Sequence, residues 1–313
     1  MNNICRIATA VAALAFAVGA AAAETDQFYN RAEPLADSTD VLNRKFNQKL
    51  ARVIDRNRNE REQALIVHEV FAALGGYGMT DWFEQWVLHS PAVARRNVAL
   101  QESVYGGMPF WSIRMIAVSG LGTTLRVNGQ LIGSDKLSHF LSQGRKYYRR
   151  YLASKSEFEA AQRGILTERA IFGAMSTGTF SNADLVANYE GHRFYRSLFE
   201  DEIVPGKPAI LRWTGNEWLM QREFDWSDHV NAFWDEALNV NAYDPLLYDR
   251  MLARLEGLCP QYRQDPDSYS VADAAVLEQR YAHLGLRDTS DLRLDSLCEN
   301  DAEKDAGGMF AAL

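Results

Sequence analysis

Three successive segments with helical apolar spacing, residues 135–153, 157–177 and 181–198, limit the fold of this chain more than any other feature. In the second segment, Ile165 and Phe172 lie on one stripe of a helix. A stripe of this kind must be covered by neighbouring elements. We therefore expect a mainly α, helical bundle-like single domain in which these three helices form the centre.

The remaining sequence adds helices and one or two short β-hairpins. Asn128-Gly129 between two short alternating runs predicts a hairpin, because a tight type I′ turn needs positive φ at both central positions. A second hairpin is expected at 210–220. The run 110–118 fits a buried helix or a buried strand equally well. Further helices are expected at 46–75, 80–89, 227–238, 245–256 and 271–284.

The first 23 residues have the pattern of a bacterial secretory signal peptide. Arg6 precedes an apolar run at 7–19, and Ala21-Ala22-Ala23 forms a small-residue cleavage site before Glu24. Cys5 lies upstream of the apolar run, which argues against a lipid-anchored protein. We expect a periplasmic or secreted protein with an irregular segment at 24–45, a single domain at 46–300 and a flexible tail at 301–313.

Charge and hydropathy exclude two classes of partner. Without Arg6, the chain carries 32 basic and 41 acidic residues, a formal charge of −9. Nucleic-acid binding needs a basic face, so we expect no nucleic-acid partner. No run after residue 23 approaches 18 apolar residues, so we expect no membrane span in the mature chain.

Cleavage would leave two cysteines, Cys259 and Cys298. In an oxidising compartment such a pair is expected to form a disulfide. Without a nearby pair of histidines, the two cysteines make a poor zinc site.

The strongest candidate for chemistry is the segment Asp135-Lys136-Leu137-Ser138-His139-Phe140, which follows the first hairpin directly. With Ser134 as the N-cap of a helix, Asp135 and His139 are four residues apart and share a face. A carboxylate beside an imidazole orients the ring and raises its basicity. Each residue alone has an ordinary explanation: Asp135 as a helix N-terminal acid and His139 as a packed core histidine.

Glu168 and Asp184 supply further carboxylates. Glu168 interrupts the apolar stripe of its helix, where an unpaired carboxylate is costly unless it is ion-paired or bound to metal. Ser181 and Asp184 have capping-box spacing, and Asn188 shares the face of Asp184. Buried ion pairing for Glu168 and helix capping for Asp184 are the structural alternatives. Gly191, on the same face, would allow close approach of a second helix.

These segments together resemble VanZ-like proteins in one pattern: Asp135-Lys136-x-x-His139-Phe140, then Glu168, then Ser181-x-x-Asp184-x-x-x-Asn188-x-x-Gly191. A set of small predicted periplasmic lipoproteins of unknown function also carries D-K-x-x-H-F. The resemblance covers residues 135–191, and VanZ-like proteins are multi-span membrane proteins linked to glycopeptide resistance. It implies a shared polar constellation and says nothing about the substrate.

The sequence therefore supports a hydrolase-like site acting on a cell-envelope substrate. We expect His139, Glu168 and Asp184 to bind a divalent metal (zinc, iron or manganese), or the two carboxylates to act as an acid/base pair. Asp135 would orient His139, Lys136 would stabilise an anion, and Asn188 would complete the site.

Two alternatives stay open. The same polar residues would form a closed structural network in a non-catalytic envelope protein. Alternatively, the Trp-rich region 213–234 would bind a small ligand in an aromatic groove. That region includes a second acidic segment, in which Asp228, Asn231 and Asp235 share a helical face beside Glu236 and fit surface charge with aromatic packing.

Overall fold

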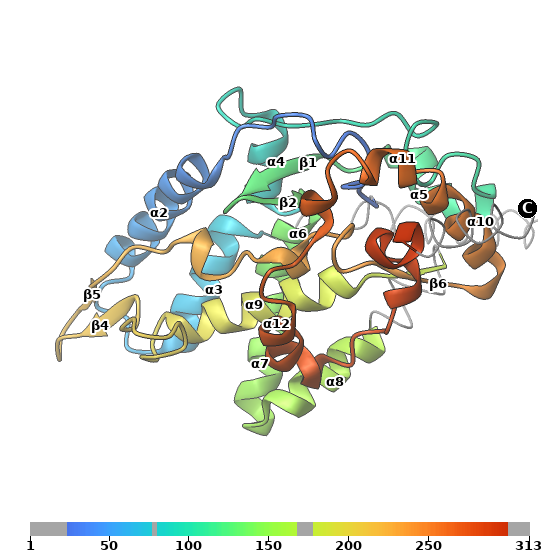
Figure 1. The fold of residues 1–313 in the computed structure, drawn as a ribbon. Coiled ribbons are helices and arrows are strands. Elements are labelled where there is room, and N and C mark those ends of the chain that lie inside the picture. Colours follow the sequence, from blue (N-terminus) through green and yellow to red (C-terminus); the bar gives the residue numbers. More distant parts are fainter. Residues whose placement is uncertain (1–23, 77–79, 168–177, 300–313) are drawn as a thin grey trace, which may run out of the picture.

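The computed structural model describes residues 24–76, 80–167 and 178–299, which form a mainly helical single domain (Figure 1). The expected fold class is confirmed. Within these described residues, three two-stranded antiparallel sheets accompany the helices. The strands are β1 (Thr124–Val127), β2 (Gln130–Gly133), β3 (Thr179–Phe180), β4 (Leu211–Trp213), β5 (Trp218–Met220) and β6 (Ala242–Tyr243).

The longer helices that surround the centre agree in part with the sequence pattern. They are α2 (Thr39–Arg56), α3 (Gln63–Leu74), α4 (Trp82–His89), α5 (Phe110–Ser119), α10 (Pro245–Glu256) and α12 (Ala274–Tyr281). The ambiguous run at 110–118 is thus helical. The turn η6 (Ala282–Leu284) continues α12 to the end of its expected range.

The expected helix at 46–75 is wrong as a single element. Residues 57–62 separate α2 from α3, because they form a polar run without an apolar residue that could bind it to the core. The segment 24–45 is also not irregular throughout, since α2 already begins at Thr39.

Both expected hairpins are present. In the first, β1 pairs with β2 from Val127–Gln130 at the turn to Thr124–Gly133 at the open end. Asn128 and Gly129 have φ of 51° and 75°, as the tight turn requires. The central helix that begins at Asp135 follows this hairpin directly. In the second, β4 pairs with β5 in register from Leu211–Met220 to Trp213–Trp218.

The central helix expected at 135–153 is continuous but not uniformly α-helical. Its segments are α6 (Asp135–Ser138), the π-helical turn η1 (His139–Gln143) and α7 (Gly144–Ser154). Single π turns inside α-helices occur frequently at functional sites. His139 is the first residue of this turn.

The other two central helices are α8 (Glu157–Thr167) and α9 (Asn182–Ser197). The second half of the helix expected at 157–177 lies outside the described residues. Both α7 and η1 pack against α9, and α7 also packs on α8 (Figure 1).

Two glycines set the distance between α9 and the helix that carries His139. A Cβ added to Gly191 would lie 1.9 Å from the carbonyl oxygen of Phe140, and one added to Gly144 would lie 2.6 Å from the Cα of Gly191. The two backbones are therefore in direct contact at this crossing. This contact brings the N-terminal part of α9 beside η1, as the sequence position of Gly191 suggested.

The helix expected at 227–238 is wrong. The segment instead forms two short 3-10 helices, η3 (Trp226–Asp228) and η4 (Ala232–Trp234). Asn231 Oδ1 accepts a hydrogen bond from Phe233 N, and Asp235 Oδ1 accepts one from Ala237 N. Short polar side chains that bind nearby backbone N–H groups in this way compete with a continuous helix.

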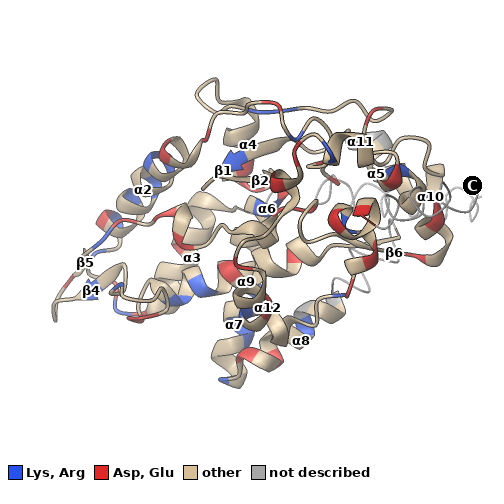
Figure 2. Ribbon diagram, in the orientation of Figure 1, with Lys and Arg blue, Asp and Glu red and all other residues tan. Residues whose placement is uncertain are grey.

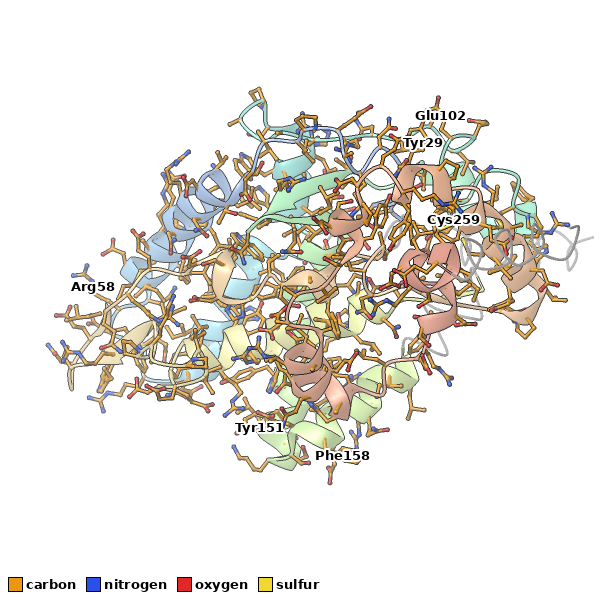
Figure 3. All side chains as sticks on the ribbon, viewed as in Figure 1. Tyr29, Arg58, Glu102, Tyr151, Phe158 and Cys259 are labelled. Carbon is orange, nitrogen blue, oxygen red and sulfur yellow. A yellow bond between two sulfur atoms is a disulfide. The ribbon has the colours of Figure 1, made fainter. Side chains whose placement is uncertain are left out.

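The expected disulfide between Cys259 and Cys298 is present, with a Cα–Cα distance of 5.3 Å. Cys259 begins α11 (Cys259–Tyr262) and is buried among the C-terminal helices (Figure 3). The bond fixes the last described residues to the body of the domain.

Acidic and basic residues are interspersed over the outer helices (Figure 2). Among the described residues, no helix has the length and apolar character needed to cross a membrane.

Candidate functional site

The candidate site lies where α6, η1 and α9 meet the loop that follows η4. Its centre is Lys136, whose side chain is 1 % exposed. Lys136 Nζ lies 2.8 Å from Asp135 Oδ2, 2.7 Å from Asp184 Oδ1 and 2.7 Å from Glu236 Oε1. A buried ammonium group is thus surrounded by three carboxylates.

The charges of this group depend on one another. Burial alone would lower the pKa of Lys136, but the carboxylates of Asp135, Asp184 and Glu236 outweigh it and raise the pKa well above its ordinary value. Burial would likewise raise the pKa of Asp184, but His139 and Lys136 hold it below the ordinary value. Lys136 and Asp184 are therefore a charged pair at neutral pH.

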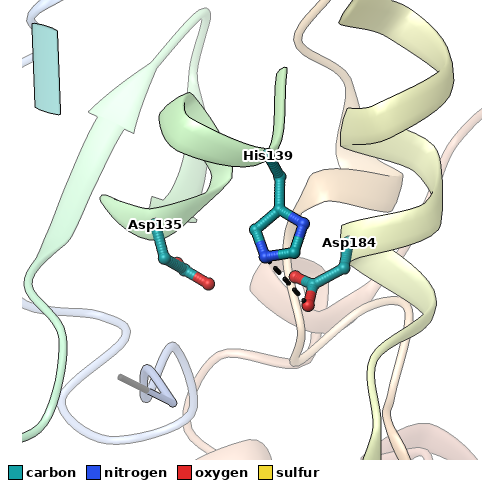
Figure 4. A group of neighbouring side chains, drawn as sticks. All are labelled: Asp135, His139 and Asp184. Carbon is teal, nitrogen blue, oxygen red and sulfur yellow. Dashed lines mark ion pairs between the residues drawn. The ribbon is translucent and has the colours of Figure 1, made fainter. Parts of the chain in front are cut away.

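His139 joins this group through both ring nitrogens. Its Nδ1 lies 3.0 Å from Asn188 Oδ1, and its Nε2 lies 3.3 Å from Asp184 Oδ2 (Figure 4). Asn188 is one helical turn beyond Asp184 on α9, so the amide and the carboxylate approach the same ring. If Nδ1 donates to Asn188, the lone pair of Nε2 faces a carboxylate, which requires a proton or another cation between them.

Asp135, His139 and Asp184 offer a set of ligand atoms suited to a metal ion. One ligand atom from each lies within 4.8 Å of the others (Figure 4). The buried Asp135 Oδ1 accepts no hydrogen bond. One imidazole and two carboxylates suit zinc, iron or manganese, and three protein ligands leave a position for water or substrate.

The positions of these residues follow from local sequence. Ser181 Oγ accepts a hydrogen bond from Asp184 N at 3.1 Å and so fixes the start of α9, as the capping pattern predicted. The Asp184 carboxylate contacts Lys136 and His139. Ser134 occupies the N-cap position of α6, but its side chain makes no capping bond and its Oγ donates instead to Glu84 Oε1.

The expected site residues Asp135, Lys136, His139, Asp184 and Asn188 are brought together. Glu168, expected as a metal ligand or catalytic acid, lies outside the described residues. His192, also on α9, lies among the rings of Tyr148, Tyr151 and Tyr189.

Glu236 is the main site residue that the sequence argument missed. It is 2 % exposed, and burial, together with Asp135 and Asp184 and against the opposing effect of Lys136, raises its pKa to about 7. Its neighbour Asp235 is also buried and binds Arg31 at 2.7 Å. The expectation of surface charge is therefore wrong for both residues. The sequence did contain a signal for their burial: both residues follow Trp234 in a segment rich in aromatic residues, which indicates packing in the core.

Glu24 was missed as well. Burial, followed by the charges of Glu236 and Asp184, raises the pKa of its carboxyl group to about 8. The environment thus separates the acids into an ionised Asp184 and two groups that hold a proton near neutral pH, which is the pattern of acid/base sites.

Glu84 and Asp81 are a second pair of buried acids, and they contact serines of α6 and η1. Ser138 Oγ donates to Glu84 Oε2, and Ser142 Oγ donates to Asp81 Oδ1 at 2.6 Å. Burial raises the pKa of Glu84 to about 8 and that of Asp81 to about 7, although these serine bonds oppose the shift.

Two tryptophans of the segment 213–234, Trp226 and Trp234, do not line an open aromatic groove. Trp226 and Trp234 are fully buried, and Trp226 packs against Phe46 and Phe83. These rings are part of the core.

Comparison with known proteins gives no further assignment: no family model, no curated protein and no solved structure matches the chain.

Proposed function

We propose that this chain is a metal-assisted hydrolase of the bacterial cell envelope, with Asp135, His139 and Asp184 as the metal ligands. The observation that carries the proposal is the position of His139 Nε2, 3.3 Å from Asp184 Oδ2, with Asp135 in the same group. An imidazole nitrogen facing carboxylates is a donor set that binds a divalent cation. Glu168 is retained in the proposal as a further ligand.

The bound metal would supply a Lewis acid that lowers the pKa of water. Side chains of the protein would supply the remaining functions of the site. Asn188 holds His139 through Nδ1 and so directs Nε2 toward the ligand position. Lys136 provides a fixed positive charge beside Asp135 and Asp184, which suits an anionic substrate group or a developing oxyanion.

Glu236 is suited to move a proton. With a pKa of about 7 it exchanges a proton near neutral pH, and its Oε1 is held 2.7 Å from Lys136 Nζ and 3.2 Å from Ser181 Oγ. In this mechanism Glu236 accepts a proton from the attacking water and returns it to the leaving group.

The cellular part of the proposal comes from the sequence. The signal-peptide pattern and the paired cysteines support export to an oxidising compartment, where the envelope polymers and lipids are the available substrates. The resemblance of residues 135–191 to VanZ-like proteins is consistent with an envelope role.

A structural network is the second candidate, favoured by the complete enclosure of Lys136 by three carboxylates. In that case the ion pairs only fix the register of α6 against α9. The chain would then bind no metal.

Metal analysis of the purified exported protein separates the two candidates. We expect about one equivalent of a divalent metal, and loss of that metal with loss of hydrolysis of envelope material in a His139→Ala, Glu168→Ala double variant. The matched control is His89→Ala, which removes an exposed histidine and should change neither. A folded double variant with unchanged metal content and activity, or a wild-type protein that takes up no metal, contradicts the metal-assisted function.

A further inference from the structure

One face of α2 carries a row of positive side chains. They belong to Lys45, Lys49, Arg52 and Arg56, which we call the basic stripe. At 3.6 residues per turn, these four positions lie within an arc of about 60° and extend over about 16 Å of the helix. Burial, followed by the charges of Lys45, Arg52 and Arg56, lowers the pKa of Lys49, as expected for like charges that lie close together. Several blue segments follow one another along α2, at the edge of the domain (Figure 2).

Within the described part of the chain, no acid forms an ion pair with the basic stripe. The acids of α2 are Asp40 and Asp55. Asp55 is ion-paired with Arg58, and Asp40 projects from the opposite flank of the helix. The positive charge of this face is therefore not compensated by the protein itself.

Two tryptophans of α4 lie beside the basic stripe. Trp82 and Trp86 are one helical turn apart, and Lys49 Nζ lies 3.6 Å from the centre of the Trp82 ring. Lys45 Nζ lies 5.3 Å from the centre of the Trp86 ring. Both tryptophans are half-buried and pack against the core, so part of each reaches the surface. The cations and the aromatic rings thus form one continuous surface.

The indole nitrogens of Trp82 and Trp86 donate no hydrogen bond to a described residue. Trp218 differs, because its Nε1 donates to the carbonyl oxygen of Glu60 at 2.6 Å. An indole that packs its apolar ring on the protein and keeps a free N–H is suited to the boundary between water and lipid. Lysines and arginines in such a place attract anionic headgroups. Both parts of this surface therefore indicate the same kind of partner.

We propose that the basic stripe, together with Trp82 and Trp86, docks this protein on the surface of a bilayer that contains anionic phospholipids. The phosphates would lie against the ammonium and guanidinium groups, and the two indoles would lie at the level of the headgroups. The contact is peripheral and needs no helix that crosses the bilayer. It goes beyond the proposed hydrolysis and does not depend on a bound metal.

A bilayer fits this surface better than a nucleic acid does. Nucleic-acid-binding domains carry an excess of basic residues, whereas this chain has more acidic than basic residues. A flat, densely charged lipid surface needs only one face of the protein. Its attraction falls off within a Debye length of about 8–10 Å, so acids on the far side of the domain are largely screened from it.

The test measures binding of the purified exported protein to lipid vesicles by co-sedimentation, with EDTA present so that a metal plays no part. Vesicles of phosphatidylcholine alone are compared with vesicles that contain about 30 % phosphatidylglycerol. We expect binding to the anionic vesicles only. That binding should be lost when NaCl is raised from about 0.1 M to about 1 M, where the Debye length falls to about 3 Å.

The cations are tested by a fourfold variant in which every residue of the basic stripe is changed to Gln. Each cation near an anionic leaflet contributes about fivefold to the partition coefficient, so we expect that coefficient to fall by roughly a hundredfold or more. If the fourfold variant does not fold, the exposed pair Arg52→Gln, Arg56→Gln replaces it, with an expected loss of roughly tenfold.

A matched control keeps the basic stripe and has the same net charge as the fourfold variant. It changes four exposed cations of other elements to Gln: Arg149, Lys155, Arg250 and Arg263. Its partition coefficient should stay within about threefold of that of the wild type, because screening weakens charges that lie away from the bilayer.

The tryptophans are tested by their fluorescence. Emission of the wild type should shift to shorter wavelength when anionic vesicles are added. The double variant Trp82→Phe, Trp86→Phe should lose this shift, since Trp226 and Trp234 are enclosed in the core. If the double variant does not fold, lipids with brominated acyl chains test the same contact: they should quench the wild-type emission, and a lack of quenching contradicts the proposal.

Four results would overturn the proposal: equal binding to both kinds of vesicle, binding to neither, a fourfold variant that binds like the wild type, or a fluorescence shift that persists in the double variant. Binding of a soluble polyanion such as dextran sulfate through the basic stripe, without binding to anionic vesicles, would also overturn it.

Discussion

Lys136 Nζ lies 2.7 Å from Glu236 Oε1, although the two residues are 100 positions apart in the sequence. Lys136→Met would leave Asp135, Asp184 and Glu236 without their enclosed cation. Removing one partner of a buried ion pair costs about 3–5 kcal/mol. We expect a loss of that size in the free energy of unfolding, measured by urea denaturation.

The control for this change is Lys155→Met, at an exposed residue that follows α7. It should leave the urea midpoint nearly unchanged. Added zinc should partly restore the Lys136→Met variant if the neighbouring ligands bind metal. A variant as stable as the wild type would show that Lys136 does not compensate the carboxylates.

The pH dependence of stability should contain a contribution from Glu84. Burial raises its pKa from 4.5 to about 8, so the folded protein holds a proton that the unfolded chain releases above pH 4.5. Stability from this group is therefore present at low pH and is lost as pH rises toward 8, by about 1.4 kcal/mol per pH unit.

Glu84→Gln should remove this contribution. Thermal unfolding between pH 5 and 9 should show a flatter dependence than in the wild type, while the exposed control Glu62→Gln keeps the original slope. An unchanged slope in Glu84→Gln would mean that Glu84 is ionised in the folded protein.

The contact between Gly191 and Phe140 should be sensitive to one methyl group. Gly191→Ala places a Cβ 1.9 Å from a carbonyl oxygen, so α9 must move away from η1. Forced overpacking costs about 1–3 kcal/mol, and the movement would also separate Asp184 from His139. We expect a lower Tm together with weaker metal binding, measured by calorimetry.

Gly257→Ala is the matched control for Gly191→Ala, because Gly257 has φ of −61° and its nearest neighbour to an added Cβ is 3.2 Å away. It should change Tm only slightly. Normal stability in Gly191→Ala would show that the backbones of α9 and η1 are not in contact.

The disulfide between Cys259 and Cys298 should stabilise the domain by about 3–4 kcal/mol, given a separation of 39 residues and a chain-entropy contribution. A double Cys→Ser variant should lower the free energy of unfolding by that amount. Reduction of the wild type with dithiothreitol should have the same effect, and should have none on the variant.

The sequence predicted best where short-range chemistry decides the structure. The turn at Asn128-Gly129 needs only two adjacent residues, and Ser181 caps α9 through a bond to Asp184 N three residues away. The close approach at Gly191 also follows from a single residue type. These features gave the fold class and most of the candidate site.

The prediction failed where distant segments decide the structure. Residues 227–238 have aromatic spacing that resembles a helix, but Asn231 and Asp235 bind their own backbone. Glu236 reaches the site only because that irregular segment turns inward. Glu24 reaches the site because the N-terminal segment packs against Gly133, a contact between residues more than 100 positions apart. No local sequence pattern predicts such a contact.

The burial of residues 25–28 has a consequence for anyone who shortens this protein. Asp26 caps the backbone of Phe28 and Tyr29, and the carbonyl oxygen of Phe28 accepts a bond from Gln261 at 2.7 Å. The segment therefore links the first hairpin, through Thr124, to helix α11, through Gln261. Removing residues 24–28 would loosen both regions at once, whereas truncation at the start of most domains leaves the rest intact.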